Sequence, residues 1–547
     1  MLFRGLHFSA LAGLLLEPAR GQGLGAPVVD LLTSVHEGVL NATAGFYSFN
    51  NVPYAEPPVG QLRFRAPIPK ITVNRTVNNG SVGRICPQAP GAAWLGISVP
   101  FMLETITGQP PPPGGPPPVT LPDPRISEDC LYLDVKAPRA VLENNQRNLP
   151  VLVWIHGGGF TGGHKSADNP AGLIAQGLRD GKSGFVYVAI NYRLGLFGFP
   201  PKGNRDWDVA TNAGLMDQRL ALLWVQLNIR KFGGDPDKVT VIGESAGASS
   251  IQAQLTAYFG IDGFTPFKRA IIQSPAIRPA TDAAVYAQVH QQFLATAGVS
   301  SMSDARDLTT AQLQGINAAM VGTSSFAHFT FGPNVDGLFF PDYLSHSLAT
   351  RKVDRTVEVI VSYTLQEGLL FTDPRVQNNT AFKAFFAGLM PSIPAPKIDA
   401  LAAVYPEDFS GAQPYRNQTQ RLTLAVSEGL ILCNAFANHL GYNSQSRAYK
   451  FSLFPGIHAQ DVGYTFWNGE PADSTGIPIN GAAATTLQRW IADFTVSGAG
   501  PGSTASQIPV YTSQAKTMNI TDSGSSVVFP DSASNPRCRF WVEGLYS

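Results

Sequence analysis

Six short runs of apolar and β-branched residues dominate the hydrophobic pattern of this chain. They are residues 150–155, 185–191, 239–243, 269–273, 357–362 and 447–453. Runs of this length are typical of strands that are buried on both faces of a sheet. Stretches with helical periodicity lie between them, for example residues 216–232 and 288–298. Strands that alternate with helices predict an α/β fold, in which helices cover both faces of a mostly parallel central sheet.

The length and composition indicate a globular protein with a large core. The chain has 547 residues, of which 44% are hydrophobic and 14% are charged. Because this length exceeds that of a usual single domain, we expect long insertions or a second domain. The stretch 109–118 is rich in Pro and Gly and predicts an extended surface loop, since proline does not fit a helix interior or a central strand.

The net charge limits the classes of binding partner, and the N-terminal residues indicate the cellular compartment. Lys plus Arg and Asp plus Glu both number 39, which gives no electrostatic reason to expect nucleic acid or an anionic membrane as a partner. Arg4, the apolar residues 6–16 and the small-residue site at 19–21 predict a signal peptide over residues 1–21. No later apolar run is long enough to span a bilayer. We therefore expect residues 22–547 to form a secreted protein that is not inserted in a membrane; the sequence does not indicate its oligomeric state.

Sequons and cysteines agree with export. Six Asn-x-Ser/Thr sequons are candidate glycosylation sites, at Asn41, Asn74, Asn79, Asn378, Asn417 and Asn519. Cysteines outside the cell are usually paired. The four here are Cys86, Cys130, Cys433 and Cys538, which allow three pairings, and pairing in sequence order closes the shortest loops.

The strongest chemical signal is the sequence GESAG at 243–247, directly after the run 239–243. A Gly-x-Ser-x-Gly motif between a strand and a helix predicts a nucleophile elbow, which holds the serine hydroxyl above the edge of the sheet. Ser245 is therefore the candidate nucleophile.

A second glycine motif follows another predicted strand, at His156-Gly157-Gly158-Gly159. Glycines let backbone N–H groups approach a ligand closely, and such donors stabilise the oxyanion formed during ester cleavage. Gly158, Gly159 and the residue after the nucleophile, Ala246, are the expected donors. The ring of His156 is expected to hold this loop rather than to react.

A nucleophilic serine needs a base and an acid that orients the base, in the order Ser, acid, His along this type of chain. His458 lies in a loop just after the run 447–453, whereas His290 and His439 fall in helical stretches. Glu367 follows the run 357–362 and is the candidate acid. Asp336 and Asp354 are the competitors, although Asp336 is typical of a turn and Asp354 precedes its strand.

Together these motifs resemble the type B carboxylesterases, the family that includes cholinesterases and Candida rugosa-type lipases. The resemblance covers nearly the whole mature chain. It rests on NVPYAEPPVG at 51–60, SEDCLYL at 127–133, the glycine loop, NYRLG at 191–195 and the elbow with its leading Glu244. It implies the α/β-hydrolase fold with long insertions, Glu367 as the acid and His458 as the base.

The resemblance also implies details outside the triad. The family pairs its cysteines in order and has an arginine–glutamate ion pair, here Arg63 with Glu128. It usually has Gly and Asp where this chain has Ser362 and Gln366, and often His-Gly where this chain has His458-Ala459; these departures concern loop shape. In the family lipases the loop at 87–129 carries the lid. Here its apolar segment 92–106 is either core packing or a mobile flap over the site.

Together with the signals for export, the resemblance predicts a secreted carboxylic ester hydrolase that forms an acyl-enzyme, with broad carboxylesterase or lipase activity that includes medium- to long-chain esters as well as short ones. One alternative is a short-chain or aryl esterase, and another is a binding or adhesion protein that uses the same fold without catalysis. The substrate is then a small-molecule or lipid ester. No metal or organic cofactor is implied, because the sequence has neither clustered Cys/His ligands nor a dinucleotide fingerprint.

Overall fold

The computed structural model describes residues 26–89, 91–109, 123–204, 206–279, 283–473, 475–500 and 502–545. The predicted signal peptide at 1–21 and all but the first residue of the proline-rich stretch 109–118 lie outside the described residues. Within the described part of the chain, no helix is long and apolar enough to cross a membrane.

Eleven strands form the central sheet, in the order β14-β13-β12-β11-β10-β9-β7-β8-β6-β4-β3. The seven strands from β13 to β8 run parallel, and antiparallel strands complete both edges. All six predicted strands are present. The strands are β3 (Val39–Asn41), β4 (Phe46–Pro53), β6 (Tyr132–Pro138), β7 (Leu149–Ile155), β8 (Val186–Ile190), β9 (Gly234–Glu244), β10 (Arg269–Gln273), β11 (Glu358–Thr364), β12 (Arg447–Phe451), β13 (Thr517–Thr521) and β14 (Gly524–Val528). A separate small sheet contains β1 (Val28–Asp30), β2 (Ser34–Glu37) and β5 (Asn74–Asn78).

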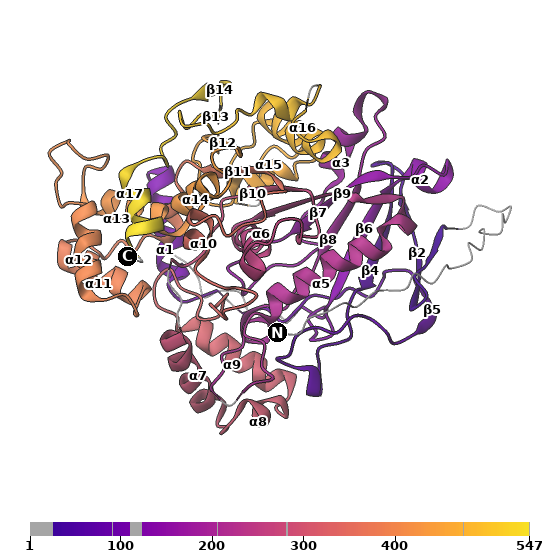
Figure 1. The fold of residues 1–547 in the computed structure, drawn as a ribbon, viewed down its shortest axis with the longest axis horizontal. Helices are drawn as coiled ribbons and strands as arrows, with labels where there is room; N and C mark the ends of the chain where they lie inside the picture. The colour runs from indigo at the N-terminus through magenta and orange to yellow at the C-terminus, as the bar shows by residue number, and fades with distance from the viewer. Residues whose placement is uncertain are drawn as a thin grey trace.

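Helices cover both faces of the sheet (Figure 1). On one face lie α5 (Ala213–Asn228) and α6 (Ala246–Thr256), and on the other lie α3 (Ala171–Leu178) and α16 (Gly481–Ser497). The alternation along β7 explains this arrangement. Val151, Val153 and Ile155 pack toward α5 and α6, while Leu152 and Trp154 pack toward α3 and α16. A strand that is apolar at every position needs a helix layer on each side.

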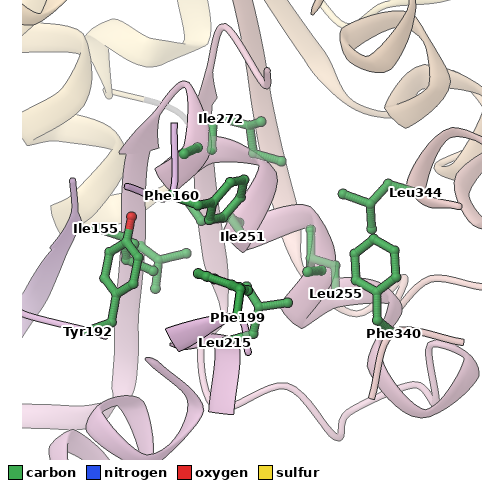
Figure 2. Close-up of a cluster of buried hydrophobic side chains, with 14 of the residues drawn as sticks. Ile155, Phe160, Tyr192, Phe199, Leu215, Ile251, Leu255, Ile272, Phe340 and Leu344 are labelled. Atoms are coloured by element: carbon green, nitrogen blue, oxygen red, sulfur yellow. The ribbon is translucent and has the colours of Figure 1, made fainter. Parts of the chain in front are cut away.

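The larger core lies on the α5–α6 face. Figure 2 shows part of it around α6, where Ile251 and Leu255 meet Phe160, Phe199 and Leu215. Complete burial of such a side chain contributes about 1.5–3 kcal/mol. This core therefore fixes α6, and with it the residue at the start of α6, against the sheet.

Two long insertions extend the fold, as expected from the chain length. Residues 274–357, between β10 and β11, carry α7 (Ala283–Ala297), α8 (Met302–Arg306), α9 (Thr310–Gly322) and α10 (Leu344–Ala349). Residues 365–446, between β11 and β12, carry η5 (Glu367–Phe371), α11 (Asn379–Leu389), α12 (Ala395–Val404), α13 (Gln418–Ser427), the π-helical turn η6 (Glu428–Leu432) and α14 (Cys433–Gly441). The remaining helices are α1 (Leu95–Thr107), α2 (Arg139–Glu143), α4 (Gly195–Gly198), α15 (Gln460–Thr465) and α17 (Pro536–Arg539).

Two disulfides join distant parts of the chain in sequence order, which confirms the pairing implied by the resemblance. Cys86 is bonded to Cys130, so the loop that contains α1 is closed at its base. Cys433 at the start of α14 is bonded to Cys538 in α17 and ties the C-terminal segment to the second insertion.

Loss of the second disulfide should lower stability substantially. The bond closes a loop with a sequence separation of 105 residues, for which the chain-entropy relation gives about 4–5 kcal/mol. We expect the Cys433→Ser/Cys538→Ser double variant to lose about that much free energy of unfolding in urea denaturation. An unchanged unfolding midpoint, together with free thiols in the unmodified protein, would contradict the pairing.

Candidate active site

Ser245 occupies the sharp turn between β9 and α6. Its backbone has φ +53° and ψ −119°, a conformation that is strained for a residue with a side chain. The flanking glycines make the turn possible. A Cβ on Gly247 would lie 2.0 Å from the Ile155 carbonyl oxygen, and one on Gly243 would lie 2.7 Å from the Gly247 carbonyl carbon. The elbow predicted from the sequence is therefore present, and it leaves the Ser245 side chain at the wall of a cavity.

His458 reaches Ser245 from the loop that follows β12. Gln460 holds this loop, because its Oε1 accepts hydrogen bonds from the N–H groups of Gly456 at 2.7 Å and Ile457 at 3.2 Å. The ring of Phe371 packs edge-on against the imidazole, with 5.3 Å between ring centroids. Only 9% of His458 is exposed, so both its position and its solvation are fixed by neighbours.

Glu367 follows β11 and is completely buried. Its Oε1 accepts a hydrogen bond of 2.6 Å from the Thr364 N–H. Gln366, one of the departures from the family pattern, connects this loop to the His458 loop: its N–H donates to the Gly456 carbonyl at 2.6 Å and its Nε2 donates to the Pro455 carbonyl at 2.8 Å. The sequence alone did not reveal this connection.

The three side chains form one chain of hydrogen bonds. Ser245 Oγ lies 2.9 Å from His458 Nε2, and His458 Nδ1 lies 2.6 Å from Glu367 Oε2. With Nδ1–H donating to the carboxylate, Nε2 is left unprotonated and faces the serine hydroxyl. This is the geometry in which an imidazole can accept the serine proton.

The other candidate acids and histidines lie away from Ser245. Asp336 accepts hydrogen bonds from Asn212 Nδ2 and from the N–H groups of a turn, as its sequence context predicted. Asp354 caps the loop before β11 through Thr356 and Thr265. His290 pairs with Asp206 at 3.1 Å, and His439 is bonded to Ser446 and stacked on Tyr511. None of these four side chains contacts Ser245 or Glu367.

The glycine loop runs along the same cavity. Gly158 and Gly159 have positive φ of 107° and 60°, and both line the cavity with Ser245. The N–H groups of Gly158, Gly159 and Ala246 donate to no other group among the described residues. His156 fixes the loop, as expected: its buried ring donates from Nδ1 to the Gly157 carbonyl at 2.9 Å and stacks on Tyr192. Three free donors are thus held close to the serine.

The cavity has a volume of about 380 Å³, within the range of small-ligand sites. Most of its wall is apolar. Side chains from the glycine loop, α1 and both insertions contribute: Leu95, Phe160, Ile277, Phe329, Phe331, Leu370, Phe371 and Leu430. Among the phenylalanines of the first insertion, Phe339 and Phe340 lie in the core instead.

The segment 92–106 forms α1 and packs on the protein. Trp94 is 4% exposed and lies against Phe326, Phe329 and Phe371, with 5.1–6.1 Å between ring centroids. Met102 is also buried and contacts Leu369, next to the Glu367 turn. The segment therefore has a packed apolar side, while Leu95 reaches the cavity.

Two further buried acids, Glu244 and Asp461, lie close to the three hydrogen-bonded side chains. Burial, together with the charges of Asp461, Glu367 and Asp168, holds the pKa of Glu244 well above its usual value. Burial and the charge of Glu367 raise the pKa of Asp461 to about 8. Glu244 Oε1 lies 3.4 Å from His458 Nε2. Both shifts favour the protonated form of these two acids.

Other residues named from the sequence also have defined places. Arg63 forms the expected buried ion pair with Glu128, at 2.7 Å. Ala459 has φ +66°, a region that favours glycine, which explains why the family often has Gly there. The sequon residues Asn41, Asn74, Asn79, Asn378 and Asn417 are exposed, whereas Asn519 is partly buried. The described residues contain no group of three or more His, Cys, Asp or Glu side chains placed to hold a metal ion.

Comparison with known proteins agrees with this geometry. A model of the carboxylesterase family matches residues 27–410. Carboxylesterase patB of Aspergillus clavatus is 36% identical and aligns over 98% of this chain and 99% of its own length. Secreted lipase 1 of Botryotinia fuckeliana is 31% identical over 72% of this chain and 69% of its own length. The crystal structure of Aspergillus niger EstA has the same fold, with a TM-score of 0.75 at 23% identity, over 94% of this chain and 98% of that one. The chain therefore belongs to the carboxylesterase family and is a carboxylic ester hydrolase with an α/β-hydrolase fold.

Proposed function

We propose that this protein is a secreted serine esterase that cleaves medium- to long-chain carboxylic esters through an acyl-enzyme intermediate. The observation that carries the proposal is the hydrogen-bonded chain from Ser245 through His458 to Glu367 at the wall of an apolar cavity. Two disulfides and five exposed sequons support secretion, as does the likeness to a relative named as a secreted lipase.

In the proposed mechanism, Ser245 Oγ attacks the ester carbonyl while His458 Nε2 takes its proton. Glu367 orients the imidazole and stabilises the imidazolium. The N–H groups of Gly158, Gly159 and Ala246 stabilise the oxyanion. His458 then returns the proton to the alcohol that leaves. Water, activated by the same imidazole, attacks the acyl-enzyme and releases the acid.

The apolar wall supports the acyl preference. Each buried methylene contributes about 0.8 kcal/mol, so a pocket that extends along Leu95, Phe329 and Leu370 favours longer chains. A catalytically silent binding protein is not favoured, since the side chains of the triad and the donor glycines are all in place. If a fluorophosphonate probe failed to label Ser245, a binding protein without catalytic activity would be favoured instead.

The triad residues should behave as one unit. We expect Ser245→Ala and His458→Ala each to lower kcat by several orders of magnitude, and the double variant to lower it little further. Glu367→Gln should lose most activity, whereas Asp336→Asn should keep it. The measurement is kcat on p-nitrophenyl butyrate. Inactivation by Asp336→Asn with activity retained in Glu367→Gln would overturn the assignment of the acid.

The chain-length preference can be tested on α1. For the unmodified enzyme, kcat/KM should rise from p-nitrophenyl acetate to medium-chain esters. Leu95→Ser removes an apolar group from the cavity wall and should impair long-chain esters more than acetate. Leu103→Ser, on the same helix but not part of the cavity wall, is the control. A steady fall in kcat/KM from acetate to palmitate in the unmodified enzyme would instead indicate a short-chain or aryl esterase.

Asp461 should make stability depend on pH. Its pKa is about 8 in the folded protein, against 3.8 when unperturbed, so the folded state binds the proton more tightly. The protonated carboxyl group of Asp461 makes its full contribution to the free energy of unfolding below about pH 4. This contribution is lost as the pH rises toward 8. Asp461→Asn should therefore gain thermal stability over the unmodified protein progressively between pH 4 and pH 8.

The matched control is Asp180→Asn, because the side chain of Asp180 is 81% exposed. Its effect on the unfolding temperature should be small at every pH. A constant difference between Asp461→Asn and the unmodified protein from pH 4 to pH 9 would show that Asp461 titrates normally.

A further inference from the structure

A second crevice, lined mainly by polar and charged residues, lies apart from the triad cavity. Its volume is about 460 Å³, and its walls come from β4, β6, the loop at 80–84 and the loop at 165–170. Four basic side chains line it: Arg84, Arg125, Lys136 and Lys165. The acids on its wall are Asp134 and Asp168.

The pattern of β6 places charge in this crevice. Leu133, Val135 and Ala137 alternate into the core, so Asp134 and Lys136 project from the other face of the strand. An alternating strand at a solvated position can carry such charges without breaking the sheet. Here Asp134 and Lys136 line the crevice instead of facing a neighbouring helix.

Two of the four cations are already neutralised. Lys165 Nζ lies 2.6 Å from Asp134 Oδ1 and also donates to Asn51 Oδ1 at 2.8 Å. Arg125 is paired with Asp123 at 2.6 Å. Among the described residues, no carboxylate lies within 4 Å of the charged groups of Lys136 or Arg84. Arg84 lies beside the Tyr132 hydroxyl, which donates to Asp129 Oδ2 at 3.1 Å.

The positive charges of Lys136 and Arg84 favour binding of an anion in the crevice. The Lys136 stem is partly buried and its ammonium lies 5.6 Å from the centroid of the Phe46 ring. Burial lowers the pKa of Lys136; the charge of Asp134 opposes this shift and the charge of Lys165 adds to it. Burial raises the pKa of Asp168, the remaining acid, to about 6. A partly desolvated cation that has no salt-bridge partner is stabilised by an anion that reaches it.

We propose that this crevice binds a small oxyanion of the sulfate or phosphate type, free or as the terminal group of a larger molecule, and that it is held by Lys136 and Arg84, the lining cations that have no salt bridge among the described residues. The site is separate from the triad cavity and shares no lining residue with it. The proposal therefore does not depend on the proposed function.

The test measures binding of radiolabelled sulfate to the full chain by equilibrium dialysis, with ionic strength held constant by sodium chloride. We expect one saturable site. Loss of a charge-assisted hydrogen bond costs about 1.5–3 kcal/mol, so Arg84→Gln and Lys136→Met should each weaken binding about tenfold or more. Lys136→Met keeps the apolar stem, and Arg84→Gln provides an independent variant if Lys136→Met fails to fold.

Lys383→Gln is the control, because it removes the same charge from an exposed pair with Asp399 on another part of the surface. It should bind sulfate as the unmodified protein does, and Arg84→Gln should keep full esterase activity. No saturable site, or an equal affinity in Arg84→Gln, Lys136→Met and Lys383→Gln, would overturn the proposal.

Competition separates the two sources of the anion. Displacement of sulfate by inorganic phosphate alone indicates a site for a free ion. Displacement by glucose 6-phosphate at equal or lower concentration indicates a site for a phosphate or sulfate group carried by a larger molecule. Failure of both competitors to displace sulfate would contradict an oxyanion site of this type.

Discussion

The site depends on how closely β7 and the β9–α6 turn approach each other. At Gly247 the backbone passes so near Ile155 that any side chain would overlap the carbonyl oxygen. Because β7 and β9 are parallel neighbours, this contact places the glycine loop after β7 beside the serine after β9. The proposed nucleophile and the proposed oxyanion donors thus lie after adjacent strands of one sheet, and the strained backbone of Ser245 is held by the core packed around α6.

The proposed base and acid, His458 and Glu367, follow two other strands of the sheet. Glu367 and His458 follow β11 and β12, which are adjacent in the sheet but separated in sequence by the second insertion. Hydrogen bonds from Gln366 join their two loops directly. The family usually has another residue at that position, so this chain uses its own contact to set the distance between the two groups.

Electrostatics around the imidazole follows from burial. Four carboxyl groups are linked through their charges. In addition to burial, the charges of Asp461, Glu367 and Asp168 raise the pKa of Glu244, and the charge of Glu367 raises that of Asp461. They cannot all be ionised in a medium that solvates charge poorly. Glu367 accepts hydrogen bonds from His458 and from the Thr364 N–H, whereas burial raises the pKa of Glu244 and of Asp461 and favours their protonated forms. Glu367 is the acid that is hydrogen-bonded to the ring of His458.

The sequence by itself determined the six central strands, the elbow at Ser245, the glycine loop and the order of nucleophile, acid and base, because these depend on local patterns. The choice of Glu367 over Asp336 and Asp354 was only favoured by position, and the pairing of the cysteines came from resemblance. The tertiary structure decided which side chains line the cavity, that Trp94 and Met102 pack while Leu95 faces the site, and that burial raises the pKa of Glu244 and Asp461. These features depend on residues brought together from distant segments, and on the loss of water around them, which no local pattern encodes.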